Sequence, residues 1–162
     1  MDYILKPKAI SFSVIDGHTE LLFPNDLNAH GPAFGGKIIA VADRLAATVA
    51  QRHHGGLCVS LSMDAARFLA PARQGEALIY RASVNRTWRT SMEIGVKVFS
   101  ENLKTGERSH IVSAYMTFVA IDQWHHPVPV RPAIPRTREQ KRRWEEAGQR
   151  REARLASLGG KK

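Results

Sequence analysis

Cysteine is almost absent from this sequence, and so are long apolar runs. The single thiol, Cys58, excludes a disulfide framework and any metal site built from several cysteines. No apolar run approaches the ~18–20 residues of a membrane-spanning helix. Residues 1–20 also lack the apolar core of a signal peptide. We therefore expect a cytoplasmic protein with no membrane span.

Acidic residues are also scarce, with 15 Asp and Glu against 24 Lys and Arg, a net charge of +9. Taken alone, this surplus suggests a nucleic-acid or anionic-membrane partner. However, residues 131–162 hold 11 Lys/Arg and 4 Asp/Glu, a net of +7, which leaves 13 and 11, a net of +2, for the other 130 residues. The basicity belongs to the C-terminal segment, and we do not expect a nucleic-acid partner.

The remaining composition is that of an ordinary globular domain. Hydrophobic residues make up 43% of the 162 residues and charged residues 24%. A chain of this length buries roughly 68–70% of its unfolded surface, so one core is sufficient and two full cores do not fit.

The C-terminal segment is set apart by prolines, which cannot continue a strand interior. They are Pro127, Pro129, Pro132 and Pro135. Residues 137–158 then predict a charged helix whose apolar stripe, with Trp144, Ala147 and Leu155, is thin. We expect residues 1–124 to form one domain, and residues 125–162 a Pro-rich linker and a basic helix that is solvated or loosely docked.

A second predicted helix covers residues 36–53. Its apolar side chains recur three and four residues apart; they are Ile38, Val41, Ala42, Leu45, Ala46 and Val49. Because Asp43 and Arg44 are the only charged residues between Ile38 and Gln51, this helix is apolar almost all round and belongs inside the protein. His53 and His54 are expected to end it as cations that complement the helix dipole.

Strand patterns follow the helix. Residues 57–65, 78–85, 92–98 and 108–121 alternate or are apolar on both faces, and residues 8–15 and 19–23 are short extended segments separated by Asp16-Gly17. A buried helix followed by four antiparallel strands predicts an α+β layer in which the sheet wraps around the helix. Since one helix covers one face of such a sheet, we expect the other face to meet a second copy.

Three features near the helix suggest chemistry. Asp43 lies in the apolar stretch without an oppositely charged neighbour three or four residues away, so it is either on a narrow solvent-facing stripe or a general base or nucleophile. Asn28 lies in a loop that is either an ordinary turn or a place to orient a water or carbonyl. Gly35-Gly36 begin the helix, either for tight packing or to present amide N–H groups to an oxyanion.

The spacing limits how these residues combine. Asp43 lies seven residues beyond Gly36, roughly 10 Å along the helix at about 1.5 Å per residue. It cannot serve a carbon held at its own helix N-terminus. Either the two act in different places, or the site is shared between subunits.

These residues together resemble hotdog-fold acyl-CoA thioesterases, the family of the cytosolic long-chain acyl-CoA hydrolase and its small bacterial relatives. The resemblance spans residues 18–122, in order and at the family's spacing. Its segments are Asn28-Ala29-His30-Gly31, Phe34-Gly35-Gly36, Ala42-Asp43, Ser62-Met63-Asp64, Phe68-Leu69-Ala70-Pro71, Arg89-Thr90-Ser91-Met92-Glu93 and Tyr115-Met116-Thr117-Phe118-Val119.

The resemblance implies hydrolysis of fatty acyl-CoA in a homo-oligomer, as a dimer and commonly a trimer of dimers. Asn28 of one chain and Asp43 of the other flank the thioester, and amides around Gly35-Gly36 polarise its carbonyl. CoA is contacted by the turn formed by Arg89, Thr90 and Ser91. It is also contacted by Ser60, at a position where relatives often carry threonine. No metal is implied, and no cofactor beyond the CoA of the substrate. Deletion of residues 131–162 is expected to leave hydrolysis largely intact, unless that segment holds the oligomer together.

Two alternatives remain open. Asp26-x-Asn28-x-His30 faintly resembles the motif of hotdog enoyl-CoA hydratases, although its proline is missing. The other alternative is a non-catalytic hotdog protein that senses acyl-CoA or binds nucleic acid through the basic tail. Cys58 is interpreted as a small filler and not as a nucleophile, because no adjacent cation or helix terminus lowers its pKa.

Overall fold

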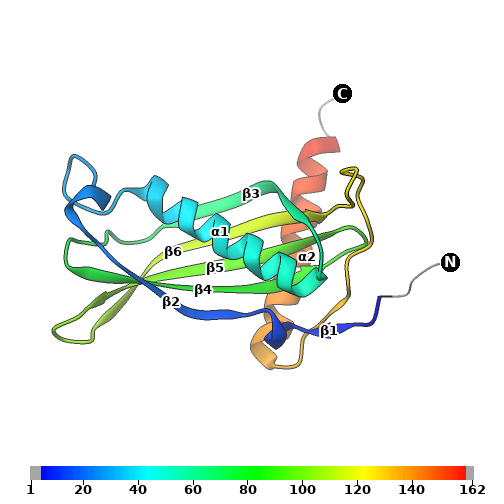
Figure 1. The fold of residues 1–162 in the computed structure, drawn as a ribbon, viewed down its shortest axis with the longest axis horizontal. Helices are drawn as coiled ribbons and strands as arrows, with labels where there is room; N and C mark the ends of the chain where they lie inside the picture. The colour runs from blue at the N-terminus through cyan, green and yellow to red at the C-terminus, as the bar shows by residue number, and fades with distance from the viewer. Residues whose placement is uncertain (1–4, 160–162) are drawn as a thin grey trace.

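The structure, a computed structural model, describes residues 5–159 and has one long helix at its centre (Figure 1). This helix is α1 (Gly35–His54), and an antiparallel sheet curls around it. The strand order is β2-β4-β5-β6-β3, with bounds Ile15–Leu21 for β2, Cys58–Phe68 for β3, Glu76–Thr87 for β4, Ser91–Asn102 for β5 and Arg108–Ala120 for β6. The predicted α+β arrangement of a sheet around a buried helix, the hotdog fold, is confirmed.

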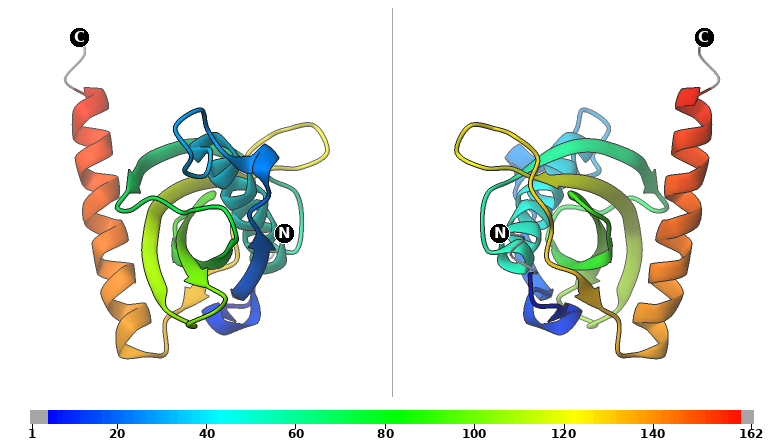
Figure 2. Two further views of the ribbon diagram at one scale, coloured as in Figure 1. Left: turned by 90° about the vertical axis from the view of Figure 1, so that its left-hand side faces the viewer. Right: turned by 90° about the vertical axis from the view of Figure 1, so that its right-hand side faces the viewer.

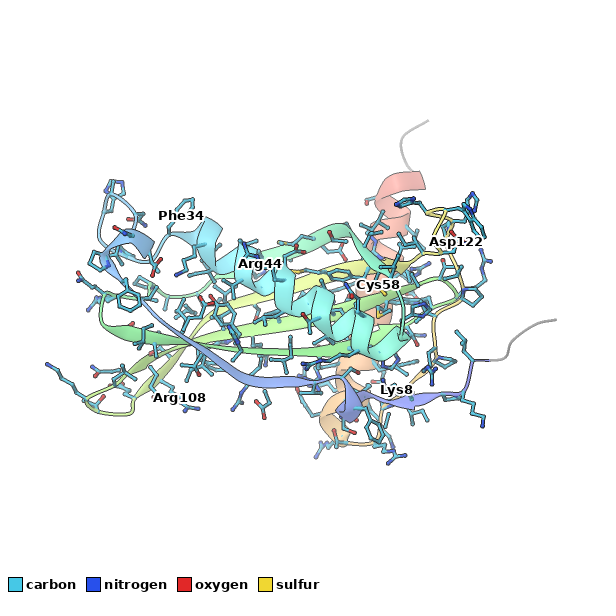
Figure 3. The ribbon with its side chains drawn as sticks, in the orientation of Figure 1. Lys8, Phe34, Arg44, Cys58, Arg108 and Asp122 are labelled. Atoms are coloured by element: carbon cyan, nitrogen blue, oxygen red, sulfur yellow. The ribbon has the colours of Figure 1, made fainter. Side chains whose placement is uncertain are left out.

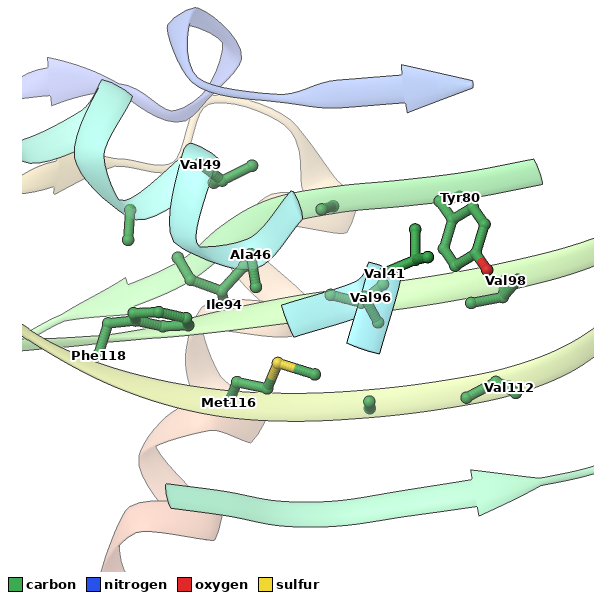
Figure 4. Packing of buried hydrophobic residues seen from close by; sticks show 14 of the residues in the cluster. Val41, Ala46, Val49, Tyr80, Ile94, Val96, Val98, Val112, Met116 and Phe118 are labelled. Atoms are coloured by element: carbon green, nitrogen blue, oxygen red, sulfur yellow. The ribbon is translucent and has the colours of Figure 1, made fainter. Parts of the chain in front are cut away.

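The core lies between α1 and the concave face of the sheet. Apolar positions of α1 such as Ala46 and Val49 are fully buried and lie over Ile94, Met116 and Phe118 (Figure 4). The helix ends at Gly55, whose φ of +88° is a left-handed conformation that glycine adopts without strain. The three- and four-residue spacing read from the sequence is therefore the buried face of α1.

The N-terminal segment differs from the expected pair of strands. Asp16 and Gly17 form no turn between two extended segments. They lie inside β2, where the register against β4 shifts between Asp16 and His18, a β-bulge with Gly17 at φ +97°. Before it, β1 (Lys8–Ala9) pairs in parallel with β7 (Ala133–Ile134), and short 3₁₀ turns cover Ile10–Phe12 and Pro24–Asp26.

The C-terminal helix α2 (Arg138–Gly159) lies along the outer face of the sheet, so that the sheet separates the two helices (Figure 2). Its thin apolar stripe predicts a solvated or loosely docked helix, but the structure shows α2 attached to the sheet. The guanidinium of Arg150 donates to both carboxylate oxygens of Glu93, at 2.7 and 3.1 Å, and Glu93 is only 1% exposed. Asn85 donates a further hydrogen bond of 2.8 Å to the same carboxylate. Polar contacts therefore attach α2 to the sheet. Residues 160–162 of the predicted tail lie outside the described residues.

Part of the expected free face is thus covered by the chain itself. A run of exposed apolar side chains lies at the edge strand β3 and just before it, where Leu61 is 68% exposed; Leu57, Val59 and Met63 are exposed as well. An edge strand of this kind is a template for pairing with another chain. None of the helices in the described range 5–159 is long and apolar enough to cross a membrane.

Candidate active site

The loop that precedes α1 fixes the orientation of Asn28. The backbone N–H of His30 donates to Asn28 Oδ1 at 2.7 Å, and since that partner is a donor, the contacted atom is the side-chain oxygen. The Asn28 N–H donates to the Pro32 carbonyl at 2.8 Å, which closes the loop. The exposed Asn28 side chain therefore presents its NH₂ group, and acts as a donor toward anything that approaches.

The start of α1 leaves amide groups free. The N–H of Lys37 donates to the Phe34 carbonyl at 3.1 Å, whereas in the described part of the chain the N–H groups of Gly35 and Gly36 have no backbone acceptor. A Cβ at Gly35 would lie 2.9 Å from the Phe68 ring, and one at Gly36 2.5 Å from the Phe34 ring. Both roles predicted for the glycines are therefore compatible with the structure: they let two rings pack closely, and they leave two N–H donors uncovered.

A salt bridge holds this loop against the helix. Lys37 Nζ lies 2.7 Å from Asp26 Oδ1, and Asp26 also accepts the backbone N–H of Phe23 at 2.9 Å. The hydrogen bond from Lys37 is the main cause that lowers the pKa of Asp26 below its usual value. Asp26 is thus engaged in fixing the loop.

Asp43 is half-buried on α1, and its carboxylate makes no hydrogen bond or ion pair with any residue between 5 and 159. At about 100° per residue it shares one stripe of the helix with Gly36, Ile39 and Ala47. Ala40 and Arg44 are exposed on the neighbouring side of the helix, which faces β2. Together with Lys37 of α1 and Leu21 of β2 they line a groove between the helix and the strand. Asp43 is therefore a carboxylate without a partner in the described part of the chain, at the border between the buried and exposed faces of α1.

Ser60 faces the same side of the sheet as α1. It is paired with Phe118, whose side chain lies in the core, and directly paired residues point to the same face. Ser60 itself is exposed because β3 is an edge strand. Its hydroxyl therefore projects from the open edge of the sheet on the face that α1 covers.

The Arg89-Thr90-Ser91 turn joins β4 to β5. Arg89 is exposed and Thr90 half-buried, but Ser91 is only 7% exposed. The Ser91 hydroxyl accepts a hydrogen bond of 3.3 Å from Arg151 Nη1 of α2. Arg89 and Thr90 are accessible to a ligand, whereas Ser91 is turned toward the C-terminal helix.

The structure does not bring all of these residues together in one chain. The Asn28 loop is attached at the start of β4, through the Ala33 N–H to the Ala72 carbonyl (2.8 Å) and the Leu22 N–H to the Glu76 carbonyl (3.1 Å). The turn follows the end of that twelve-residue strand, roughly 40 Å away at about 3.3 Å per residue. Figure 1 shows the two at opposite ends of the sheet, and Figure 3 labels Phe34 at the loop end and Cys58 toward the other.

Other reactive groups in the described residues do not form a competing site. Burial raises the pKa of the Cys58 thiol to about 11, which agrees with its interpretation as a filler. No three His, Cys, Asp or Glu side chains within residues 5–159 are grouped so that they could hold a metal ion. The residue that the sequence reasoning missed is Arg151, which reaches the turn from a helix that the sequence predicts to be solvated or loosely docked.

Known proteins share both the sequence and the fold. A family model described as the thioesterase superfamily matches residues 30–107. The acyl-CoA thioester hydrolase YkhA of Bacillus subtilis, named as uncharacterized, is 39% identical over 122 residues, which cover 75% of this chain and 71% of YkhA.

Two solved structures extend the match over nearly the whole chain. A hexameric acyl-CoA thioesterase, crystallised in its apo form, superposes with a TM-score of 0.92 at 37% identity, over 97% of this chain and 100% of that one. The acyl-CoA hydrolase of Staphylococcus aureus, in complex with butyryl-CoA, CoA and CoA disulfide, has a TM-score of 0.87 at 32% identity, over 93% and 92%. This chain belongs to the thioesterase superfamily.

These relatives identify the chain as a thioester hydrolase of the hotdog fold. The hydratase and non-catalytic alternatives are not favoured. The Staphylococcus aureus hydrolase has also been solved as variants in which an aspartate, an asparagine or a threonine is replaced by alanine.

Proposed function

We propose that this thioesterase hydrolyses fatty acyl-CoA to free fatty acid and CoA at a site shared between two subunits. The observation that carries the proposal is the separation of the site residues within one chain. The Asn28 loop and the Arg89 turn lie roughly 40 Å apart along β4, and the Asp43 carboxylate has no partner among residues 5–159. A second copy that pairs at β3 supplies the missing half of each site.

Asp43 acts on the thioester carbonyl carbon, and two routes fit its position. As a general base it takes a proton from a water that attacks the carbon; as a nucleophile it forms a mixed anhydride that water then cleaves. In both routes the C–S bond breaks, the CoA thiolate leaves and is protonated, and one water is consumed. A single turnover in ¹⁸O-water with enzyme in excess separates the general-base route from a nucleophilic route in which water attacks the Asp43 carbon of the anhydride. The first acid released contains ¹⁸O in the former and an Asp43 oxygen in the latter, so release of unlabelled acid assigns the nucleophilic role.

Asn28 and the start of α1 stabilise the oxyanion that develops on the thioester oxygen. The Asn28 NH₂ group is available because its oxygen is held by the His30 N–H. The free N–H groups of Gly35 and Gly36 lie at the positive end of the α1 dipole, where negative charge is favoured. Donors that are fixed before the reaction lower its barrier without having to be reorganised.

CoA is held at the other end of the substrate. Arg89 is exposed and forms no ion pair with the described residues, so its guanidinium is free for a phosphate. Thr90 adds a hydroxyl beside it. The exposed Ser60 hydroxyl lies at the β3 edge toward the same end of the sheet, since Ser60 pairs with Phe118 and Phe118 with Met92. The Staphylococcus aureus hydrolase, solved with CoA, supports a CoA substrate, and its altered aspartate, asparagine and threonine are residue types that match Asp43, Asn28 and the hydroxyl of Ser60.

Assembly as a dimer, and as a trimer of such dimers, follows from the same reasoning. The exposed apolar residues of β3 support the dimer, and the hexameric relative supports the trimer of dimers. CoA enters as part of the substrate, with no separate cofactor. A cytoplasmic location stays a prediction.

Thiol release from acyl-CoAs of graded chain length tests the proposal, with crotonyl-CoA included. We expect one CoA thiol and one free acid per thioester consumed. Hydration of crotonyl-CoA without thiol release would support a hydratase, and tight acyl-CoA binding without turnover would support a sensor; either result contradicts the proposal.

A further inference from the structure

The turn between β4 and β5 is held by hydrogen bonds from the end of β6 and from the C-terminal segment. The Ala120 N–H donates to the Thr90 carbonyl at 3.0 Å, and the Val130 N–H donates to the Arg89 carbonyl at 2.8 Å. Just before the turn, Thr87 Oγ1 accepts the Ala133 N–H at 3.0 Å. The turn's own closing bond, from the Trp88 N–H to the Ser91 carbonyl, is 2.8 Å long. Two of these four bonds, from Val130 and Ala133, come from the Pro-rich linker that precedes α2.

The helix α2 adds side-chain contacts to the same turn. Arg151 Nη1 donates to Ser91 Oγ at 3.3 Å, and the Arg151 guanidinium lies 4.6 Å from the centre of the Trp88 ring. Arg86 lies over the Trp88 ring at 5.8 Å and over the Trp144 ring of α2 at 5.1 Å. Guanidinium groups are attracted to aromatic faces at such distances. Arg151 is thus in contact with both Trp88 and Ser91 of the turn.

The arginines of this cluster differ from the others on the outer face. Arg142, Arg150 and Arg154 each pair with a carboxylate, of Glu139, Glu93 and Asp64 respectively. Among residues 5–159, no carboxylate forms an ion pair with Arg86, Arg89 or Arg151. Three uncompensated positive charges therefore gather around Trp88, at the turn that is free to meet anionic groups.

A cavity beside the turn is formed by the same elements. Trp88 and Arg89 line it together with Pro129, Pro132 and Trp144, so the linker and α2 supply much of its wall. The C-terminal segment is therefore a part of the surroundings of the turn and not a separate appendage.

We propose that the C-terminal segment positions the turn for the nucleotide part of CoA, with Arg151 as the positioning residue that holds Trp88 and Ser91 in place. The inference rests on the proposed function, because it assigns the CoA phosphates to Arg89 and Thr90. Arg151 acts through the turn, and the thioester end of the substrate is handled elsewhere. Loss of Arg151 therefore impairs recognition of the nucleotide and leaves the chemistry of the thioester unchanged.

Two substrates with the same acyl group test this directly: acyl-CoA, and the matching acyl-pantetheine, which has the thioester but lacks the nucleotide. For Arg151→Ala we expect KM for acyl-CoA to rise about tenfold, the equivalent of losing one cation–π contact and one hydrogen bond, with kcat unchanged. We expect kcat/KM for acyl-pantetheine to stay at the wild-type value. Arg151→Lys retains the charge but not the planar fork, so it should behave in the same direction and gives a second variant if Arg151→Ala folds poorly.

Arg142→Ala is the matched control, because Arg142 lies on the same helix and, among residues 5–159, forms ion pairs only with Glu139 and Glu146 of that helix. It should keep the wild-type ratio of kcat/KM between the two substrates. If both Arg151 variants keep this ratio too, or lose activity equally on both substrates, the positioning role is wrong. If wild-type enzyme releases no thiol from either substrate, the proposed function itself fails, and the two failures are thereby distinguished.

Discussion

Glu93 on β5 and Arg150 on α2 form a bidentate ion pair across the outer face of the sheet, at 2.7 and 3.1 Å. Glu93 is almost completely buried, and the Arg150 guanidinium also lies 3.7 Å from the centre of the Tyr115 ring. A buried carboxylate is costly without its partner. This pair is therefore the main polar anchor of the C-terminal helix.

Replacement of Arg150 alone should be strongly destabilising, because it leaves the Glu93 charge buried and unpaired. For Arg150→Met we expect a loss of about 3 kcal/mol in the free energy of unfolding, measured by urea denaturation. The double variant Glu93→Gln/Arg150→Met removes the buried charge and should recover part of that loss. Arg142→Met, at an exposed pair, should cost less than about 1 kcal/mol. A double variant that is less stable than Arg150→Met would contradict this account.

His53 should make stability depend on pH. It is fully buried, with Nδ1 accepting the Ser13 hydroxyl at 3.2 Å and Nε2 donating to the Arg131 carbonyl at 3.0 Å. Burial is the main cause that lowers its pKa to about 4, so it is neutral near pH 7 and not the helix-ending cation that the sequence predicts.

Because the unfolded chain binds this proton more readily, stability contributed by His53 is complete above about pH 6.5 and is lost as the pH falls toward 4. Each unit of the shift corresponds to about 1.4 kcal/mol. Unfolding free energies measured at pH 7, 6 and 5 should fall for the wild type, and the slope should be shallower for His53→Gln. Equal slopes in the two proteins would exclude His53 as the cause.

Cys58 should be chemically inert. Burial raises its pKa to about 11, so its thiolate fraction at neutral pH is on the order of a hundredfold below that of an ordinary thiol. We expect labelling by a thiol reagent to be slow in the native protein and fast in urea, and kcat/KM to be unchanged in Cys58→Ala. A large loss of activity in that variant would assign the thiol a role that this site does not give it.

The fold was largely predictable from the sequence, for a physical reason. The spacing in α1 and the alternation in β4 and β5 directly record which side chains meet the core. The alternation in β3 does not, because its apolar residues Val59 and Leu61 are exposed at the edge of the sheet. The docking of α2 could not be predicted in this way, because Glu93 occupies a polar position of its strand and polar positions are interpreted as solvent-facing. At Gly17 the sequence predicts a break between two extended segments where the structure has a bulge inside one strand, since glycine is typical of both.

The site could be predicted only as a set of residues. Asp43, Asn28 and the glycines were named from residue type and spacing, but their roles stay predictions until they are tested. The contribution of Arg151 depends on α2 meeting the turn, a contact between residues 60 positions apart that no local pattern records. The sequence predicts that hydrolysis largely survives removal of residues 131–162 unless that segment holds the oligomer together. Because the deletion removes Arg150 and Arg151, we now expect it to lower stability and to raise KM for acyl-CoA.

Single replacements should separate the two catalytic groups from the rest of the fold. Asp43→Ala should lower kcat by about 10²–10⁴-fold, because it removes the base or nucleophile. Asn28→Ala should lower it by about 10²–10³-fold, as expected for loss of an oxyanion donor. Both variants should keep the wild-type oligomeric state, measured by size-exclusion chromatography with light scattering. Near-normal turnover in either variant would contradict the assigned roles.

The most direct test of a site shared between subunits is to mix these two inactive variants and measure thiol release. After co-refolding equal amounts of Asp43→Ala and Asn28→Ala, about half of the dimers contain one chain of each kind, and each such dimer has one intact site and one with both residues missing. The shared site therefore predicts recovery of about a quarter of the wild-type activity. No recovery from well-mixed oligomers would show that Asn28 and Asp43 act within one chain, and would contradict the central claim.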